Sequence, residues 1–570
     1  MRTSEQIINE ILNKRGICTE EELAEFLSDK PTKTYDPFLL DGVQEGVDLL
    51  LSEIEKGSRV CVYGDYDADG VTAVCVMACA MNALDCDWFY YIPSRFEEGY
   101  GLNVAALEKI REEGAGVVIT VDCGCVSKAE VAFAQSIGLK VIVTDHHTIE
   151  DVMADCIVID PKKPARFLGD AEPYPCADLA GCGVAFKFVQ ALQRQANLPK
   201  SILNDALDMV AVGTVGDIVP LRDENRTLVK YGTVIANSGR RPALKKLAEN
   251  ISLSEINSEN IAFGIVPHIN ACGRMDSAKE AVKLFLSEDS TVIGEQVGKL
   301  VHFNSERKRI QEKAYEACLS QISGDESFII LVENDMHEGI AGIVAGKLKD
   351  RFNRSVIIVT PSGDGFLKGT GRSIPKIDIY SVLSNVNAAG HEANGEDLFV
   401  RFGGHRSACG FLMKEENLEA LRRGVEAQVI DLLSEDSELF HVPLEADTYL
   451  EPAELSIELG RELKKLAPFG EGNPSPKFAM KGMQIRGLSY MGEERTHARF
   501  SVFEGGPGTG GTGAGPVYAA CVLFRRAQEL KGILEAGKPV NMIGSLSHQI
   551  WRAQEKVQFI VEEIEIAEEN

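Results

Sequence analysis

Three aspartates at alternate positions, Asp65, Asp67 and Asp69, stand in VYGDYDADGV (62–71), a stretch otherwise rich in small and apolar residues. Crowded like charges raise the free energy of a fold unless a cation lies among them. Carboxylate oxygens are the ligands that hard divalent cations such as Mg²⁺ and Mn²⁺ prefer. Alone, the stretch could be an acidic turn; an EF-hand is disfavoured because no glutamate stands at the twelfth loop position.

Further acids and histidines follow apolar stretches that read as buried strands, namely RVCVYGD, AGVVITVD, LKVIVTDHH and CIVIDP. The residues at their ends are Asp65, Asp122, Asp145 with His146 and His147, and Asp160. Two adjacent histidines of a strand would face opposite sides, so a shared core position does not explain them. Asp217, in VGTVGDIVPL (212–221), follows an apolar helix, where a lone buried acid would be costly.

Strands and helices alternate from about residue 46 to 235, with VTAVCVMACAMNAL and NVAALEKIREEG as helices between the first two strands. This alternation predicts a doubly wound parallel sheet. Ligands of such sheets bind at the carboxyl ends of the strands, near a switch point in strand order. We therefore expect the strand-end acids and histidines to meet in one crevice.

The pattern of predicted secondary structure changes twice in the rest of the chain. KLVHFNSERKRIQEKAYEACLSQI predicts a long connecting helix, and SFIILVEN, EGIAGIVAGKLKDRF and SVIIVTP begin a second α/β pattern. From about residue 440, short β-rich runs predict a small β-barrel, with the glycine-rich stretch 505–516 as a loop between two strands. At the N-terminus, Thr3 and Gln6 have capping-box spacing, which predicts an amphipathic helix.

Composition limits the possible functions. The net charge of -27 argues against a nucleic-acid partner unless basic residues are concentrated locally. The 14 cysteines include no C-x-x-C pair, the nearest approach being Cys123-Gly-Cys125, so we expect reduced thiols. No stretch approaches the roughly 20 apolar residues of a membrane span. We expect a cytoplasmic protein with no membrane contact.

The ordered set of D-x-D, an aspartate after a strand, Asp145-His146-His147 and a later aspartate resembles the DHH phosphoesterase superfamily. Further segments, spread over nearly the whole chain, are similar to the RecJ family: IPSRFEEGYGLN, INACGR, HEGIAGIVAGKL, KGTGRSIP, FGGHRSACGF and LAPFGEGNPSPKF. The resemblance implies a metal-dependent 5′→3′ exonuclease that hydrolyses single-stranded DNA to 5′-mononucleotides in DNA repair and recombination.

The resemblance also implies an α/β architecture: a doubly wound parallel-sheet DHH domain, a second α/β DHH-associated domain joined by a long helix, and a C-terminal OB-type β-barrel. We divide the chain into an N-terminal helical segment (1–45), the DHH catalytic domain (46–245), a helical connector (246–325), the DHH-associated substrate-binding domain (326–435) and the OB-like nucleic-acid-binding domain (436–570).

Carried over residue by residue, the family's ligands for two divalent ions, Mn²⁺ or Mg²⁺, fall on Asp67, Asp69, Asp122, His146 and Asp217. Asp122 is the expected bridge, and Asp65 is either a further ligand or a carboxylate behind the ligands. We expect Asp145 to orient His146 and not to bind metal. His147 is expected to touch the scissile phosphate or to assist the leaving oxygen.

The implied substrate-binding residues come from several segments. A pocket for the 5′ phosphate maps to Arg95, Thr370 and Arg372, and His405 would close on the substrate as a further catalytic residue. The remaining candidates on the DNA path are His268, Asn270, Arg274 and Trp551. Trp551, like Phe500 and Tyr518, could stack on bases or belong to the barrel core. The implied partners are single-stranded DNA, a RecQ-type helicase and a single-strand-binding protein; we expect a monomer.

Three features depart from the family pattern. Tyr63 stands where superfamily members often have a histidine, which leaves one metal site a ligand short, to be filled by Asp65 or water. His268 replaces an arginine expected to contact the DNA backbone, which puts affinity and salt dependence in doubt. The stretch 505–516 is an unexplained insertion.

Two alternatives are weighed: a DHH phosphodiesterase for short oligonucleotides or cyclic dinucleotides, and a non-catalytic DHH scaffold. The barrel motif PFGEGNP disfavours the first, and the complete set of acids and histidines disfavours the second.

Overall fold

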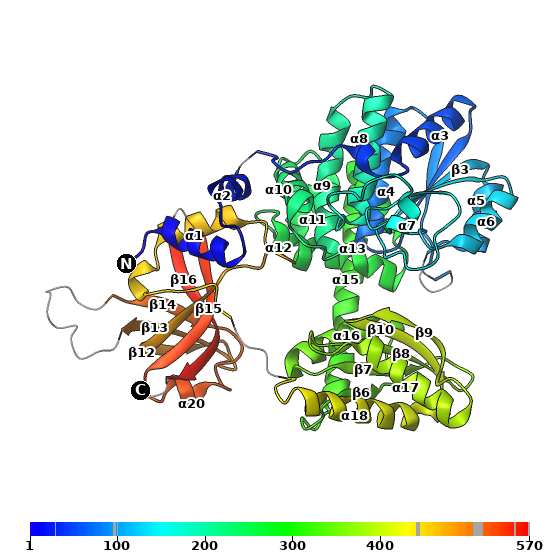
Figure 1. Ribbon diagram of the computed structural model, residues 1–570. Helices are drawn as coiled ribbons and strands as arrows, with labels where there is room; N and C mark the ends of the chain where they lie inside the picture. The colour runs from blue at the N-terminus through cyan, green and yellow to red at the C-terminus, as the bar shows by residue number, and fades with distance from the viewer. Residues whose placement is uncertain are drawn as a thin grey trace.

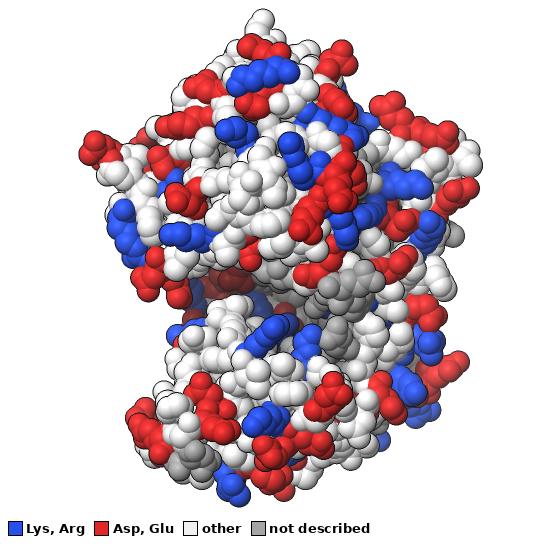
Figure 2. Space-filling model, turned by 90° about the vertical axis from the view of Figure 1, so that its right-hand side faces the viewer, with Lys and Arg blue, Asp and Glu red and all other residues white. Residues whose placement is uncertain are grey.

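The computed structural model describes the chain except residues 29, 95–97, 100, 441–444, 505–516, 552–553 and 568–570, and except the side chains of 338, 393, 394 and 551. Arg95, the glycine-rich stretch and the side chain of Trp551 thus lie outside the described residues. The chain forms two α/β lobes joined by a long helix, with a β-barrel beside them (Figure 1). A hollow separates the two α/β lobes on the face shown in Figure 2.

The first lobe is built on a parallel sheet, as predicted, with strand order β2-β1-β3-β4-β5. The order reverses between β1 and β3, which makes this the switch point of the sheet. The strand β2 was not anticipated, because WFYY is short and lacks alternation. The strands are β1 (Arg59–Tyr63), β2 (Trp88–Tyr91), β3 (Ala115–Val121), β4 (Lys140–Thr144) and β5 (Ile157–Ile159).

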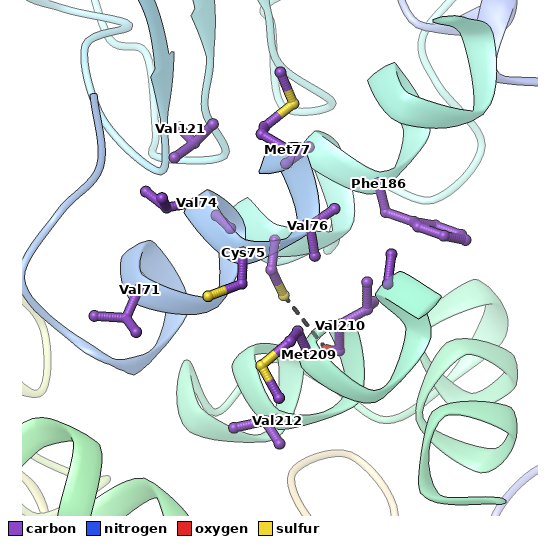
Figure 3. Packing of buried hydrophobic residues seen from close by; sticks show 14 of the residues in the cluster. Val71, Val74, Cys75, Val76, Met77, Val121, Phe186, Met209, Val210 and Val212 are labelled. Atoms are coloured by element: carbon purple, nitrogen blue, oxygen red, sulfur yellow. Dashed lines mark hydrogen bonds between the residues drawn. The ribbon is translucent and has the colours of Figure 1, made fainter. Parts of the chain in front are cut away.

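Helices cover both faces of this sheet, which confirms the doubly wound arrangement. One face packs on α3, α4, α8 and α9, the other on α5 and α6. Helix α4 is apolar on nearly all sides because it lies between the sheet, α8 and α9, as Val74, Phe186 and Met209 show in Figure 3. The helices are α3 (Val43–Glu55), α4 (Ala68–Ala83), α5 (Val104–Glu112), α6 (Lys128–Ser136), α7 (Ala165–Leu168), α8 (Gly181–Gln195), α9 (Ser201–Gly216) and α10 (Asp223–Asn237).

The connector is helical, as expected, and ends in the 30-residue helix α15 that reaches the second lobe (Figure 1). None of the helices in the described ranges is long and apolar enough to cross a membrane. Helix α11 (Pro242–Asn250) spans the expected start of the connector at residue 246. It is followed by α12 (Ser258–Asn260), a π-helical turn (Ile261–Ile265), α13 (Val266–Met275), α14 (Lys279–Leu286) and α15 (Ser290–Leu319).

The second lobe has a mixed sheet with strand order β6-β7-β8-β10-β9, in which only β6 and β7 pair in parallel. Its glycine-rich strands pack closely: a Cβ on Gly369 would lie 2.0 Å from the ring of Phe411 on the neighbouring strand. The elements are β6 (Ile329–Val332), α16 (Glu338–Phe352), β7 (Val356–Pro361), β8 (Phe366–Arg372), α17 (Ile379–Asn394), β9 (Phe399–His405), β10 (Ala408–Lys414) and α18 (Leu418–Glu435).

The C-terminal sheet closes into a barrel because β12 pairs with both β13 and β15. The elements are β11 (Thr448–Tyr449), α19 (Ile457–Leu463), β12 (Lys477–Met491), β13 (His497–Glu504), β14 (Ala519–Leu523), α20 (Lys531–Leu534), β15 (Val540–Trp551) and β16 (Gln554–Ile566). Short 3₁₀ turns occur at Pro37–Leu39, Glu415–Asn417, Pro452–Glu454 and Lys464–Leu466.

The N-terminal helices α1 (Ser4–Lys14) and α2 (Glu20–Leu27) lie against the C-terminal barrel. The capping box of Thr3 and Gln6 is confirmed, but the apolar face of α1 packs into the barrel core, so residues 1–27 are not a separate segment. Arg2 stabilises this contact, since its guanidinium forms an ion pair with Glu454 at 2.7 Å. The two ends of the chain therefore belong to one lobe.

Candidate metal centre

The loop after β1 holds the first candidate ligands. Asp67 is the N-cap of α4, and its Oδ1 accepts hydrogen bonds from the N–H groups of Asp69 (2.9 Å) and Gly70 (3.1 Å). A Cβ on Gly70 would lie 2.6 Å from the backbone N and O of Asp65. Only glycine permits this tight return of the chain, which brings Asp65 back over the first turn of α4.

Asp122 follows β3 in a left-handed conformation, with a φ of 62° that aspartate tolerates better than most residues. Its N–H donates to the carbonyl of Thr144 at 3.0 Å. Opposite it, α8 begins at Gly181, where a Cβ would lie 2.5 Å from the Cβ and 2.6 Å from the Oδ1 of Asp122. The missing side chain at residue 181 makes room for the Asp122 carboxylate.

The N-terminus of α8 also fixes Asp69. The N–H of Gly181 donates to its Oδ2 (2.6 Å), and the N–H of Cys182 donates to its Oδ1 (2.9 Å). The positive end of the helix dipole favours a carboxylate at this place. These two donors favour the ionised carboxylate, but burial outweighs them and raises the pKa of Asp69, so a nearby cation would be needed to hold it in the ionised form that a metal ligand requires.

His146 lies among three of these carboxylates. Its Nε2 is 3.1 Å from Asp122 Oδ1, 3.5 Å from Asp217 Oδ2 and 3.8 Å from Asp69 Oδ2. Within the described structure neither of its buried ring nitrogens has a hydrogen-bond partner. Burial lowers its pKa to about 4, so the imidazole is neutral at neutral pH and its nitrogen can act as a ligand.

The candidate ligand atoms form three groups of three, each with its atoms within 4.8 Å of one another: Asp65, Asp67 and Asp122; Asp69, His146 and Asp217; and Asp122, His146 and His147. Burial, followed by mutual repulsion, raises the pKa of Asp122 well above its usual range. The same causes raise that of Asp217 to about 8. A buried cluster of this charge is stabilised by cations, and oxygen ligands with one imidazole fit Mn²⁺ or Mg²⁺.

The turn that carries Asp217 is braced by the segment that leads into the barrel. The N–H of Leu221 donates to the carbonyl of Glu471 at 2.7 Å. Gly472 has a φ of 70°, and a Cβ there would lie 3.0 Å from the side chain of Pro220. The segment LAPFGEGNPSPKF thus packs against the turn that follows a candidate ligand, a contact that the sequence did not reveal.

Asp145 has a different partner from the one expected. Its Oδ1 accepts from the N–H of His146 (2.7 Å) and contacts the ring Nδ1 of His147 (2.7 Å), while its Oδ2 accepts from the N–H of Cys125 (2.9 Å). Asp145 therefore orients the ring of His147 and not that of His146. Burial opposes protonation of His147, but the hydrogen bond and charge of Asp145 outweigh it and raise its pKa to about 9.

Tyr63, which replaces the histidine that superfamily members often have, points into the core. Its hydroxyl donates to the carbonyl of Gly101 (2.8 Å) and accepts from Asn103 (3.2 Å), and its ring stacks on Tyr91. It supplies no ligand. Asp65, by contrast, belongs to the first group of three ligand atoms.

Two of the three candidate phosphate-binding residues, Thr370 and Arg372, lie on the second lobe, and the third, Arg95, lies outside the described residues. Thr370 and Arg372 occupy alternate positions of β8, so they share a face of the sheet. A Cβ on Gly342 of α16 would lie 2.8 Å from the Arg372 guanidinium, so this glycine lets the guanidinium rest on the helix. His405 ends β9 and is exposed, with its Nδ1 3.0 Å from the hydroxyl of Ser407.

The segment containing INACGR joins the metal loop to the second lobe. Asn270 Oδ1 accepts from the N–H of Ala68 (2.8 Å), between two candidate ligands, and Arg274 donates to the carbonyl of Gly339 (2.8 Å) at the start of α16. His268 does not meet the expectation of a DNA contact. It is buried, and its Nδ1 and Nε2 lie 2.6 Å from the Gly264 carbonyl and 3.0 Å from the Asn304 amide.

Of the aromatic residues expected to stack on bases, Phe500 is buried in the barrel core, which corrects that possibility. Tyr518 is 40% exposed, and its hydroxyl accepts from Arg486 at 2.6 Å. The side chain of Trp551 lies outside the described residues.

A cavity of about 590 Å³ adjoins the Asp217 turn and is lined from both α/β lobes and the lead-in to the barrel. Its wall is mainly apolar, with Ile218, Phe263 and Phe469, and its charged side chains are Arg274, Arg307, Glu259 and Glu471. Lys and Arg side chains also border the hollow between the lobes in Figure 2. Basic and acidic side chains therefore both border this region.

Comparison with known families matches three models to the three lobes. The DHH family N-terminal domain matches residues 59–214, the DHHA1 domain matches residues 325–431, and the RecJ OB domain matches residues 446–563.

Two curated relatives carry the description single-stranded-DNA-specific exonuclease RecJ. The one from Bacillus subtilis is 32% identical and aligns over 99% of this chain and 68% of its own length. The one from Salmonella typhimurium is 33% identical over 83% of this chain and 82% of its own length. Crystal structures of RecJ from Thermus thermophilus with Mn²⁺ and with Mg²⁺ superpose with TM-scores of 0.77 and 0.72, at 28% and 27% identity, over 100% of this chain and 79% and 78% of theirs.

Proposed function

Because the chain belongs to the RecJ family of single-stranded-DNA-specific exonucleases, we propose that its overlapping groups of candidate ligands hold two divalent cations for phosphodiester hydrolysis. The observation that carries this proposal is the position of Asp122. It belongs both to the group with Asp65 and Asp67 and to the group with His146 and His147, and its Oδ1 lies 3.1 Å from the ring of His146. It is therefore the proposed bridging ligand. Divalent cations supply Lewis acidity, activating water and neutralising charge on the phosphate.

The residues around the site have distinct tasks in this proposal. The N-terminus of α8 holds Asp69, and the turn braced by Glu471 holds Asp217, so the ligands are positioned before substrate arrives. Asp145 holds Nδ1 of a protonated His147, which is 44% exposed. His147 can then donate its Nε2–H to a phosphate oxygen or to the leaving oxygen.

The polarity of the proposed exonuclease is 5′→3′, with release of 5′-mononucleotides. Thr370 and Arg372 of β8, with Arg95 from the first lobe, are the proposed partners of the 5′ phosphate, and His405 would approach the substrate from the second lobe. The shared face of Thr370 and Arg372 supports this assignment. An arginine guanidinium forms charge-assisted, often bidentate hydrogen bonds with phosphate.

A RecQ-type helicase and a single-strand-binding protein are proposed partners, on the family resemblance alone. We retain the cytoplasm as the proposed location because all 14 cysteines are free thiols, which suits a reducing compartment.

The experiment measures kcat/KM on single strands with a 5′ phosphate and with a 5′ hydroxyl, in Mn²⁺, with sizing of the products. Wild type should favour the phosphorylated end. Arg372→Ala should lose about 10- to 150-fold on that end, the equivalent of about 1.5–3 kcal/mol for hydrogen bonds to a charged group, and much less on the hydroxyl end. Arg423→Ala is the control, an exposed arginine on α18 at the far end of the same lobe (Figure 1). Degradation from the 3′ end, or equal losses on both ends, would contradict the proposed pocket.

A further inference from the structure

Arg307 of α15 is a half-buried cation with neutral partners. Its Nε and Nη2 donate to Asn304 Oδ1 (3.0 and 2.8 Å), and its Nη1 donates to Gln311 Oε1 (2.9 Å). Among the described residues no carboxylate forms an ion pair with it, and burial lowers its pKa with no acidic neighbour opposing that change. Arginine nevertheless stays protonated at neutral pH, so the charge remains uncompensated.

Within the described structure Arg226 and Arg354 also donate to no carboxylate, only to backbone carbonyls, but other buried arginines do have an acidic partner. Arg241, for example, is largely buried, and its Nε pairs with Asp208 at 2.7 Å. A chain with a net charge of -27 has many acids with which a cation could pair. Removing a cation from water without an anion is costly, so an uncompensated guanidinium in a cavity wall is a place where an anionic ligand is favoured.

The orientation of Arg307 is set by a row of hydrogen bonds that begins at His268. The His268 ring donates from Nδ1 to the carbonyl of Gly264 (2.6 Å), so its Nε2 accepts from the amide of Asn304 (3.0 Å). The carbonyl oxygen of Asn304 must then face Arg307. His268 and Asn304 are both buried, which keeps this row intact.

The cavity that Arg307 lines offers complementary groups. Phe263 and Ile218, at 81% and 70% exposure, present apolar surface, and Ile218 directly follows the candidate ligand Asp217. Base stacking on exposed rings together with cations for the backbone is the usual way that proteins hold single strands. A strand with alternating phosphates and bases fits this combination of groups.

We propose that Arg307 binds a backbone phosphodiester of the substrate strand and that His268 and Asn304 position its guanidinium. This inference rests on the proposed exonuclease function. It assigns His268 a positioning role in place of a DNA contact. The cation that the family pattern leads one to expect at residue 268 is then supplied by Arg307 of α15.

The test is binding of a fluorescein-labelled oligothymidylate in EDTA, followed by anisotropy over a series of salt concentrations. Arg307→Gln should raise Kd about 10-fold and reduce the slope of log K against log salt by about 0.7, the value for one phosphate contact on a single strand. Arg309→Gln is the matched control. It removes the same charge from the same helix, but Arg309 is 66% exposed and paired with Glu306. It should leave Kd and slope close to those of wild type.

Asn304→Asp separates positioning from folding, because it places a carboxylate beside the guanidinium without changing side-chain size. It should weaken DNA binding because the carboxylate neutralises the guanidinium. The new ion pair offsets part of the cost of losing the amide donor to His268, and the melting temperature shows whether the variant is folded. In a further series of oligonucleotides, one phosphate at a time is replaced by a neutral methylphosphonate. At the position that Arg307 contacts, wild type and Arg307→Gln should bind with equal Kd, because the charge that Arg307 recognises is absent.

Equal slopes for wild type and Arg307→Gln, or equal losses in Arg307→Gln and Arg309→Gln, would overturn the assignment of Arg307. Wild-type affinity in a folded Asn304→Asp variant would overturn the positioning role. Wild-type protein that neither binds nor degrades single strands would instead contradict the proposed function itself.

Discussion

Substitution of Gly181 by alanine is a severe test of the proposed metal centre. Glycine has no side chain, and this leaves room for the carboxylate of Asp122, the proposed bridging ligand. The new Cβ would lie 2.5 Å from the Cβ of Asp122, whereas ordinary contact begins at 3.4 Å. The two groups must therefore separate by about 0.9 Å, several times the roughly 0.2 Å that ligand distances tolerate. We expect Mn²⁺ affinity to fall about 10- to 100-fold, the usual effect of disturbing groups that hold metal ligands.

Mn²⁺ binding, followed by electron paramagnetic resonance or calorimetry, measures this loss independently of nuclease activity. Gly183→Ala is the control, since it lies in the same helix and its Cβ would meet Leu179 at an ordinary 3.5 Å. Both substitutions replace glycine by a better helix former, so the fold itself should not be lost through the backbone. If Gly181→Ala bound Mn²⁺ as tightly as Gly183→Ala does, the packing of α8 against Asp122 would not determine the site.

Asp122→Asn, chosen because asparagine tolerates the positive φ, should keep the fold and abolish hydrolysis of single-stranded DNA; residual Mn²⁺-dependent turnover near the wild-type rate would refute a bridging role. His268→Arg restores the arginine that the family pattern leads one to expect at this position. Because residue 268 is buried next to Asn304, the substitution should place a second cation near Arg307, lower stability by about 1–3 kcal/mol and raise Kd for single-stranded DNA. Tighter binding with an unchanged melting temperature would show this to be wrong. Burial disfavours ionisation of Glu454, but the hydrogen bonds and charge of Arg2 lower its pKa to about 2, so its stabilising effect is present above the unfolded value of about 4.5 and is lost as pH falls toward 2. Glu454→Gln should therefore unfold more easily at pH 7, and the difference in melting temperature from wild type should shrink below pH 4.5; a constant difference would contradict the assignment.

The sequence by itself determined the features that depend on neighbours along the chain. The strand-end positions of Asp65, Asp122 and His146 followed from apolar runs and the alternation of strands with helices. The doubly wound sheet then required these residues to meet, because parallel strands end at the same edge. The cap of α1 and the long helix α15 were predictable for the same reason, since capping and helical periodicity are local.

Other features needed the tertiary structure because they depend on which surfaces meet. The apolar face of α1 does not specify its partner, and only the structure places it in the barrel core. Strands β8 to β10 are rich in glycine and polar residues, so their pattern was weak until pairing and the ring of Phe411 explained it.

The candidate site shows the same limit at the level of single side chains. Sequence identifies His268 as polar but not the side that it faces, and the structure turns it inward to Asn304. The sequence did not single out Gly181 or Arg307 as functional residues. Gly181 matters because it has no side chain beside Asp122, and Arg307 matters because it has no acidic partner among the described residues. Both properties belong to pairs of residues brought together through space, and the order of residues along a single chain does not record such pairs.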